Sequence, residues 1–344
     1  MYRTTHWLAV VAPVLLVAGT VGVATRAVAA ADDLQSRAQT AFKPLERPAP
    51  MAAVRVDLGR QLYHDPRLSK SGAISCASCH NLASGGVDNR ETSLGHKAQV
   101  GGRNAPTTLN ASVHLAQFWD GRAKDLTEQA KGPILNPGEM ALPSEAEAVK
   151  VVRSVPGYQK AFKAAFPGSG VTYQNIAVAI ADFEKTLVTP SRFDDYLRGR
   201  KDALSATEKK GLKTFMDKGC VTCHGGVGVG GSMYMKFGVV APYKHQADEG
   251  RFAITKDPAD KYVFKVPSLR NIQKTYPYFH DGKVWSLDEA VGIMGKTQLG
   301  LDLAADERAA IVAFLKSLDG ELPVQALRLP ELPVSGPDTP RPSL

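Results

Sequence analysis

The sequence predicts a mainly α-helical fold in two halves of similar plan, with long loops and at most a small β-hairpin. The main observation is a five-residue motif, C-x-x-C-H, that occurs at residues 76–80 and again at residues 220–224. Apolar residues at helical spacing precede and follow each copy, whereas runs of alternating polarity are scarce. The chain of 344 residues also contains 31 glycines and 22 prolines, which is consistent with much loop.

Both motifs indicate covalent attachment of a c-type haem, in which two thiols bond to one porphyrin and the adjacent histidine binds the iron. A zinc ribbon would place its two C-x-x-C pairs about 15–20 residues apart, whereas these pairs lie more than 140 residues apart. A pair of disulfides is the other alternative, but a histidine follows each pair. The residues predicted to hold two haems, which include every cysteine of the chain, are Cys76, Cys79, His80, Cys220, Cys223 and His224.

Covalent haem is normally attached outside the cytoplasm, so an export signal is expected, and residues 1–30 have the features of one. Arg3 precedes an apolar run over residues 7–24, and small residues at positions 27–30 fit a cleavage site. An uncleaved anchor is the alternative, because the run is near the lower limit of a bilayer span. The remaining chain has no comparable apolar stretch, so we expect a periplasmic protein without a stable membrane span after cleavage.

The charged residues argue against a nucleic-acid partner. The chain has 42 Lys and Arg against 34 Asp and Glu, a formal net charge of +8. The basic residues are scattered and form no cluster interleaved with aromatic residues. Residues 1–30 contribute two arginines and no acid, and the carboxylates of two haems would bring the mature protein close to neutral.

The first half is predicted to open and close with a helix. Val54, Leu58 and Leu62 recur every four positions before the first motif. After the motif, apolar residues at 4-3-4 spacing over residues 176–187 predict a second amphipathic helix, and Pro190 follows it. These two helices would enclose the first haem site.

The second half repeats this plan. Leu212, Phe215 and Met216 form the apolar face of a predicted helix before the second motif, and Ser205 with Glu208 fits a capping box at its start. Apolar residues recur at helical spacing over residues 311–318, and Gly320 fits the position after a helix C-terminus. Two short helices packed over a haem, with loops supplying the rest, is the plan of cytochrome c.

Three shorter patterns complete the organisation. Residues 239–240 and 262–264 are long enough only for a small hairpin. The sequence G-V-G-V-G-G at residues 226–231 matches a dinucleotide-binding fingerprint, but it follows a haem histidine and opens no helix, so we expect a loop at the haem edge. The proline-rich end of the chain is expected to be extended or disordered.

The predicted domains follow from these elements. A mature chain of about 314 residues is long enough for two domains. We expect a signal peptide at residues 1–30, an N-terminal cytochrome c-like domain at residues 31–195, a C-terminal cytochrome c-like domain at residues 196–321, and a proline-rich tail at residues 322–344.

Each proximal histidine leaves one axial position on its iron. By spacing alone, His96, His114 and His64 compete for the first iron; His96 lies in a glycine-bearing loop sixteen residues after His80. Methionine is the other common ligand and raises the haem potential. Met294 precedes a glycine before the final helix, where single-haem cytochromes c place their methionine, although a core methionine is the alternative. The other methionines considered are Met51, Met140, Met216, Met233 and Met235.

A series of further motifs occurs in order along the chain. They are G-G-V-D at residues 85–88, S-L-G-H at 93–96, R-N-A-P-T at 103–107, F-W-D-G-R-A at 118–123, E-Q-A-K-G-P at 128–133, N-P-G-E-M at 136–140, P-S-L-R-N at 267–271, Y-F-H-D-G at 278–282 and M-G at 294–295. The chain from about Leu58 to Leu318 thereby resembles the bacterial di-haem cytochrome c peroxidases, which share their fold with the MauG-type enzymes. The resemblance implies reduction of hydrogen peroxide to water, with electrons from a small periplasmic donor protein, a cytochrome c or a cupredoxin, and it implies a homodimer.

The resemblance also implies roles for single residues. His96 matches the ligand of the N-terminal, peroxidatic haem that is displaced on activation, and Met294 matches the ligand of the C-terminal, high-potential haem. Trp119 matches the aromatic residue that lies between the two haems. Gln129 and Glu139 match the polar pair of the peroxide pocket.

A calcium ion between the domains is a further implication of the resemblance. Asn104, Thr275 and Pro277 match the positions that hold it, through oxygens that suit a hard cation. In MauG-type enzymes the position of Met294 is a tyrosine, so methionine favours a peroxidase over a MauG-like enzyme that oxidises a protein substrate. A non-enzymatic di-haem electron carrier is the other alternative, and it would need neither a displaceable ligand nor a pocket acid.

Glu139 is the residue expected to move a proton between the two oxygens of peroxide, because a carboxylate in a partly apolar pocket can act as a general acid–base catalyst. Glu128, which lies beside Gln129, is its nearest rival. Reduction of the methionine-ligated haem could bias the loop that carries His96 towards release, which would be a two-state switch.

Overall fold

The fold is mostly helical, as the sequence predicts. The computed structural model describes Met1 and residues 33–343, so the predicted signal peptide lies outside the described residues apart from Met1. Within the described part, the one sheet is an antiparallel pair of three-residue strands. No helix of that part is long and apolar enough to cross a membrane. The predicted fold class is therefore confirmed.

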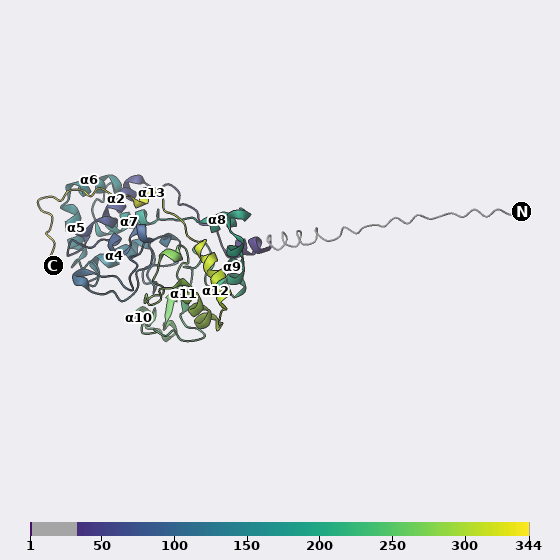
Figure 1. Cartoon of the computed structure of the whole chain (residues 1–344). Helices are drawn as coiled ribbons and strands as arrows, with labels where there is room; N and C mark the ends of the chain where they lie inside the picture. Colours follow the sequence, from purple (N-terminus) through teal and green to yellow (C-terminus); the bar gives the residue numbers. More distant parts are fainter. Residues whose placement is uncertain (2–32, 344) are drawn as a thin grey trace.

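Each half is built around a pair of packed helices (Figure 1). In the first half, α2 (Ala53–His64) packs on α7 (Tyr173–Glu184). In the second half, α9 (Ala206–Asp217) packs on α12 (Ala305–Lys316). All four helices agree with those predicted from apolar spacing. Further α-helices are α3 (Cys76–Cys79), α4 (Leu126–Leu135), α5 (Glu145–Arg153), α6 (Pro156–Ala165), α8 (Arg192–Leu197), α10 (Phe252–Thr255), α11 (Leu287–Met294) and α13 (Val324–Leu327).

A glycine at the same point of each pair lets the two helices approach closely. A Cβ on Gly59 of α2 would collide with the carbonyl oxygen of Ala179 in α7, and a Cβ on Gly211 of α9 would collide with that of Ala310 in α12. The two halves therefore share the same helix crossing. The predicted capping box is also present, since the hydroxyl of Ser205 accepts a hydrogen bond from the first turn of α9.

Two loops repeat between the halves as well. Residues 106–110 (P-T-T-L-N) correspond to residues 267–271 (P-S-L-R-N), and residues 118–122 (F-W-D-G-R) correspond to residues 279–283 (F-H-D-G-K). In both copies of the second loop, the phenylalanine and the glycine have positive φ angles. Each copy is also closed by an isolated antiparallel bridge. The chain therefore contains a structural repeat that extends beyond the helices and the C-x-x-C-H motifs.

Thr189 joins the repeated loops of the two halves. Its hydroxyl accepts a hydrogen bond from Nδ2 of Asn110 at 2.8 Å and another from Nδ2 of Asn271 at 2.7 Å. These asparagines hold equivalent positions in the two copies, and both have a left-handed backbone. Oδ1 of Asn110 accepts from the backbone N–H of Thr189, and Oδ1 of Asn271 accepts from that of Gly320. The segment after α7 is thereby fixed to both halves.

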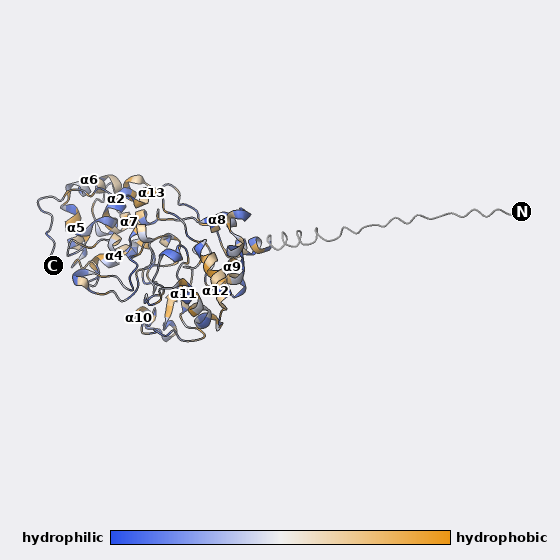
Figure 2. Cartoon of the chain, viewed as in Figure 1, coloured by the Kyte–Doolittle hydropathy of each residue, from blue (hydrophilic) through white to orange (hydrophobic). Residues whose placement is uncertain are grey.

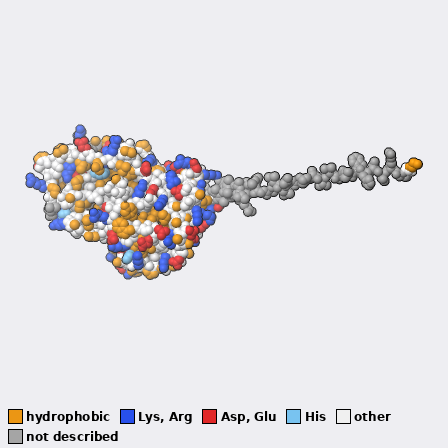
Figure 3. All heavy atoms as spheres, viewed as in Figure 1, with side chains coloured by type: hydrophobic (Ala, Val, Ile, Leu, Met, Phe, Trp, Pro, Cys, Tyr) orange, Lys and Arg blue, Asp and Glu red, His pale blue; other side chains and the backbone are white. Residues whose placement is uncertain are grey.

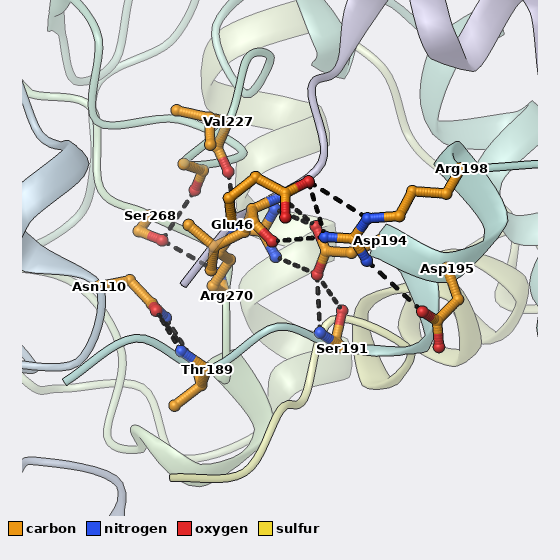
Figure 4. Close-up of polar contacts among 12 residues, drawn as sticks. Glu46, Asn110, Thr189, Ser191, Asp194, Asp195, Arg198, Val227, Ser268 and Arg270 are labelled. Carbon is orange, nitrogen blue, oxygen red and sulfur yellow. Dashed lines mark hydrogen bonds and ion pairs between the residues drawn. The ribbon is translucent and has the colours of Figure 1, made fainter. Parts of the chain in front are cut away.

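A fully buried ion pair lies next to this junction (Figure 4). Asp194 of α8 accepts hydrogen bonds from both terminal nitrogens of Arg270, at 2.9 and 2.8 Å, and both side chains are 0% exposed. The carboxylate also accepts from the backbone N–H groups of Leu45 and Ser191, at 2.7 Å each. Nε of Arg270 donates to the carbonyl oxygen of Val227 at 2.7 Å. The pair therefore connects four separate segments of the chain.

The small sheet consists of β1 (Tyr234–Lys236) and β2 (Val263–Lys265). The strand predicted at residues 262–264 is confirmed to within one residue, but the prediction at residues 239–240 is wrong. That segment is an exposed turn, in which the side-chain oxygen of Gln298 accepts hydrogen bonds from the backbone in place of a neighbouring strand. The loop predicted at the glycine-rich sequence after the second motif is observed.

Each half has its own apolar core, and its helices carry both apolar and polar residues (Figure 2). Residues 33–41 are helical, and Leu34, Ala38 and Phe42 belong to the core of the second half although they precede the first motif. On the face seen in Figure 3, basic and acidic side chains both occur. The start of the described chain thus adds to the second core.

The C-terminal tail, residues 322–343, packs on the first half. It is extended apart from α13, and it ends close to α5 in Figure 1. Nε2 of Gln61 donates to the carbonyl oxygen of Glu331 at 3.0 Å, and Arg67 donates to the hydroxyl of Ser335 at 2.9 Å. The extended form expected for this tail is therefore observed, and specific contacts hold it.

We expect Gly211→Ala to destabilise the protein by about 1–3 kcal/mol, because the added Cβ would overpack the crossing of α9 and α12. Helix propensity alone would make the alanine variant about 1 kcal/mol more stable than the parent protein. The expected destabilisation therefore has the opposite sign. The measurement is denaturant-induced unfolding.

Gly132→Ala is the matched control for this substitution. Gly132 also lies inside a helix, but its added Cβ would meet its nearest neighbour, Phe118, at an ordinary 3.4 Å. This variant should be as stable as the parent protein or slightly more stable. Equal destabilisation by both substitutions would contradict the crossing argument.

Candidate functional site

A cavity in the second half brings the second motif and Met294 together. Cys220, Cys223 and His224 line this cavity, and Met294 reaches it from the C-terminal end of α11. Burial lowers the pKa of His224 to about 4, so its imidazole is neutral and able to bind a metal. Backbone contacts of the His224 ring with Pro267 and Val229 oppose this shift without cancelling it. Two thiols, an imidazole and a thioether around one cavity fit a c-type haem with His/Met ligation.

Trp119 and the three predicted calcium positions line this same cavity. Nε1 of Trp119 donates to the carbonyl oxygen of Asn104 at 2.9 Å, and Nδ2 of Asn104 donates to that of Arg90 at 2.9 Å. Thr275 and Pro277 lie on the wall beside them. The described residues contain no cluster of three or more His, Cys, Asp or Glu suited to a metal ion, so a cation here would need amide and backbone oxygens. The calcium site stays a prediction.

The first motif begins with α3, which packs against α2. The hydroxyl of Tyr63 on α2 donates to the carbonyl oxygen of His80 at 2.6 Å. Both ring nitrogens of His96 are buried and have no hydrogen-bond partner among the described residues, and burial lowers the pKa of His80. A buried polar atom without a partner costs about 1–3 kcal/mol. Free thiols at Cys76 and Cys79 beside such imidazoles fit a second c-type haem.

The loop that carries His96 packs on the loop that carries Glu139. The backbone N–H of His96 donates to the carbonyl oxygen of Glu139 at 2.7 Å. A Cβ on Gly95 would collide with the carbonyl oxygen of Gly138, so the close approach of the two loops requires glycine at this position. Lys97, next in the chain, has a positive φ angle of 57°. The candidate iron ligand and the candidate acid are thus in direct backbone contact.

The other two histidines that compete with His96 by spacing are placed differently. His114 lines the cavity of the second motif, where burial lowers its pKa to about 3. Nδ1 of His64 lies 2.9 Å from the carbonyl oxygen of Arg60, one helical turn before it. These positions favour His96 as the ligand of the first iron, although the assignment stays a prediction.

Burial raises the pKa of Glu139, while the nearby Arg122 charge and a hydrogen bond from Asn136 oppose this shift. Nδ2 of Asn136 donates to Oε1 of Glu139 at 2.8 Å. Glu139 lines an open pocket together with Arg122 and Glu128. Glu128 forms an ion pair with Lys131 at 2.8 Å, so its carboxylate already has a cationic partner. Glu139 is therefore the better candidate for proton transfer.

Gln129, the predicted partner of Glu139, follows Glu128 on α4 and is half-buried. It is not among the residues that line the pocket of Glu139. Its role in a peroxide site therefore rests on the sequence resemblance.

Three buried polar residues near these sites were given no role in the sequence analysis. Lys265 and His280 line the cavity of the second motif. Glu184, at the end of α7, is 4% exposed, and burial raises its pKa to about 8. Comparison of the two repeats would have drawn attention to Lys265, which takes the place of Asn104, and to His280, which takes the place of Trp119.

The chain is similar to known di-haem proteins over most of its length. Residues 53–202 match the family described as di-haem cytochrome c peroxidase, and residues 208–319 match cytochrome c. The cytochrome c551 peroxidase of Nitrosomonas europaea is 54% identical, with 87% of this chain and 90% of the relative covered. The cytochrome c551 peroxidase of Pseudomonas aeruginosa is 50% identical, with 92% and 94% covered. Among solved structures, a MauG-like protein associated with microbial copper homeostasis has a TM-score of 0.75 at 30% identity, covering 83% of this chain and 96% of that protein.

Proposed function

The chain belongs to the di-haem cytochrome c peroxidases, and we propose that it reduces hydrogen peroxide to water at an N-terminal haem with electrons that enter through a C-terminal haem. The protein binds two covalent c-type haems, one at each C-x-x-C-H motif. The observation that carries the proposal is the contact between the loop of His96 and the loop of Glu139, because it unites a displaceable ligand with a pocket acid.

The haem irons, when bound, supply the electron storage and the redox chemistry of peroxide cleavage. Cys76 and Cys79 hold one porphyrin and Cys220 and Cys223 the other. His80 and His224 are the proximal ligands, for which their neutral, buried rings are suited. The ring nitrogens of His96 are free to occupy the remaining position at the first site.

Glu139 is the proton carrier of the proposed reaction. Its carboxylate accepts a proton from the inner oxygen of hydrogen peroxide and returns it to the outer oxygen, which leaves as water. A raised pKa suits this task, since the group must both take up and release a proton near neutral pH. Asn136 fixes one carboxylate oxygen and leaves the other for the substrate.

His96 controls access to the first iron in this proposal. Its loop has a left-handed residue at Lys97 and depends on Gly95 for its close approach to Gly138. Movement of His96 would therefore disturb the backbone of Glu139 as well. Release of His96 from the iron and movement of Glu139 would then occur together. Such a two-state switch can be biased by a change at the distant haem.

Two alternative functions are less well supported. Met294, in place of the tyrosine of the MauG-type enzymes, favours the peroxidase, as do the higher identities to the peroxidases than to the MauG-like structure. A non-enzymatic electron carrier would have no use for a buried acid beside a displaceable histidine. Turnover of peroxide with a reduced small cytochrome or copper protein, in the fully oxidised and the half-reduced forms, separates the three.

The proposal also includes the location of the enzyme, its oligomeric state, its electron donor and a calcium ion. We place the mature enzyme in the periplasm as a homodimer, with a cytochrome c or a cupredoxin as donor. A calcium ion at Asn104, Thr275 and Pro277 would lie beside Trp119, which shares their cavity and is the proposed aromatic residue on the path between the haems.

Glu139→Gln should lower turnover by about 10²–10⁴-fold with unchanged haem spectra, because it keeps the shape of the side chain and removes its transferable proton. Since the base form is needed and burial raises its pKa, wild-type activity should fall as the pH drops through a value above the ordinary range of glutamate. This acidic limb should vanish in the variant. Glu128→Gln is the control, and a larger loss in that variant would transfer the role to Glu128.

His96→Gly should leave the first iron open in the fully oxidised protein. Cyanide would then bind at once, whereas the wild type would bind it after one-electron reduction. Absorption spectroscopy during cyanide titration is the measurement. His64→Ala, which removes another histidine of the first half, should retain the wild-type behaviour. If the first haem of His96→Gly stays low-spin and does not bind cyanide, another residue is the ligand.

Met294→His should lower the potential of the C-terminal haem, because a thioether stabilises reduced iron relative to an imidazole. The variant should also lose activity, since the haem would no longer accept the activating electron. Potentiometric titration tests this, with Met235→Leu as the control because Met235 lines the same cavity. Unchanged potentials for both haems in Met294→His would remove Met294 as a ligand.

A further inference from the structure

Lys265 is a buried cation without an anionic partner. It ends β2, is 7% exposed, and lines the cavity of the second motif. Burial lowers its pKa to about 8, and no charge of the protein opposes this effect. Among the described residues, no side chain forms an ion pair or a hydrogen bond with its ammonium group. The ammonium therefore has no counter-charge from the protein, and burial of an uncompensated charge is costly.

The cavity itself offers no carboxylate to this cation. No Asp or Glu is among the described residues that line it. The other deeply buried cation nearby, Arg270, has Asp194 at 2.8 Å, so the fold does supply a partner where the charge is structural. The anion that compensates Lys265 must then arrive with whatever occupies the cavity.

His114 is a second unpaired donor on the same wall. Its Nε2 is buried without a partner among the described residues. The positive charge of Lys265 also contributes to the lowered pKa of its ring. The close packing of Gly231 on this ring fixes its position, because a Cβ there would lie 2.6 Å from Cδ2 of His114. An ammonium and an imidazole that line one largely apolar cavity form a binding site for a carboxylate.

We propose that Lys265 binds a propionate carboxylate of the C-terminal haem and that His114 is the second donor to it. The proposal rests on the assignment of that haem to this cavity. Lys265 is then a positioning residue with an electrostatic role, since its positive charge favours the reduced form of the haem.

The backbone of Lys265 also connects the proposed propionate contact to Trp119. Its N–H donates to the carbonyl oxygen of Trp119 at 2.8 Å, and Nε1 of Trp119 donates to Asn104 at 2.9 Å. One residue thereby fixes both the edge of the haem and the aromatic residue proposed to lie on the electron path. Phe264, the preceding residue, stacks on His280 with 4.3 Å between ring centroids, which holds this part of β2 in place.

The test is potentiometric titration of the haem-loaded full-length protein carrying Lys265→Met. The reduction equilibrium of the C-terminal haem should shift towards the oxidised form by about tenfold, which is about 59 mV for one electron, while the N-terminal haem stays unchanged. Lys265→Arg keeps the charge and should retain most of the wild-type potential. Lys236→Met removes the same charge from the exposed end of β1 and should leave both potentials unchanged.

The outcomes separate this inference from the function on which it rests. A wild-type protein without a second haem spectrum would refute the proposed function. Two loaded haems with unchanged potentials in Lys265→Met would refute the role of Lys265 alone. If Lys265→Met does not fold, a crystal structure of the haem-loaded wild type decides, because Nζ of Lys265 with no propionate oxygen within about 4 Å overturns the proposal.

Discussion

The buried ion pair between Asp194 and Arg270 is the contact on which the arrangement of the second half depends. A buried pair contributes little net stability, but the loss of one partner leaves an uncompensated charge and costs about 3–5 kcal/mol. Here the carboxylate also binds the backbone at Leu45 and Ser191, and the guanidinium binds Val227. The pair thus links the start of the described chain, α8 and two loops around the second haem site (Figure 4). The pair thereby holds α8 to the loops that follow the second motif, directly after the Thr189 junction between the halves.

The buried polar groups of this protein fall into two kinds, those with hydrogen-bond partners in the protein and those without. Asp194 and Arg270 have multiple hydrogen-bond partners, whereas both ring nitrogens of His96 and Nε2 of His114 are buried without a partner among the described residues. Such unpaired groups are rare in folded proteins, because each carries an uncompensated loss of hydration. These two histidines lie at the two candidate haem sites, where a cofactor with an iron and two carboxylates can supply the missing partners.

The two halves share a plan but differ where the chemistry requires it. Both have a glycine at the helix crossing and an asparagine that binds Thr189. The first half adds the loops of His96 and Glu139, which suit an iron that opens to substrate. The second half has Lys265 in its cavity and Met294 at the end of α11, which suit an iron that stays closed and holds an electron at higher potential.

The sequence by itself determined the elements that depend on local pattern. Helical spacing located α2, α7, α9 and α12, and the two C-x-x-C-H motifs identified the points where two haems are attached. These signals are local because helix periodicity and covalent haem attachment both depend on residues a few positions apart. Only the tertiary structure decided the contacts between distant segments, such as the Glu139 loop against His96, the packing of the C-terminal tail on the first half, and β1. The burial of Lys265 could not be predicted from the sequence either. A lysine in a short strand is ordinarily exposed, and only long-range packing buries it here.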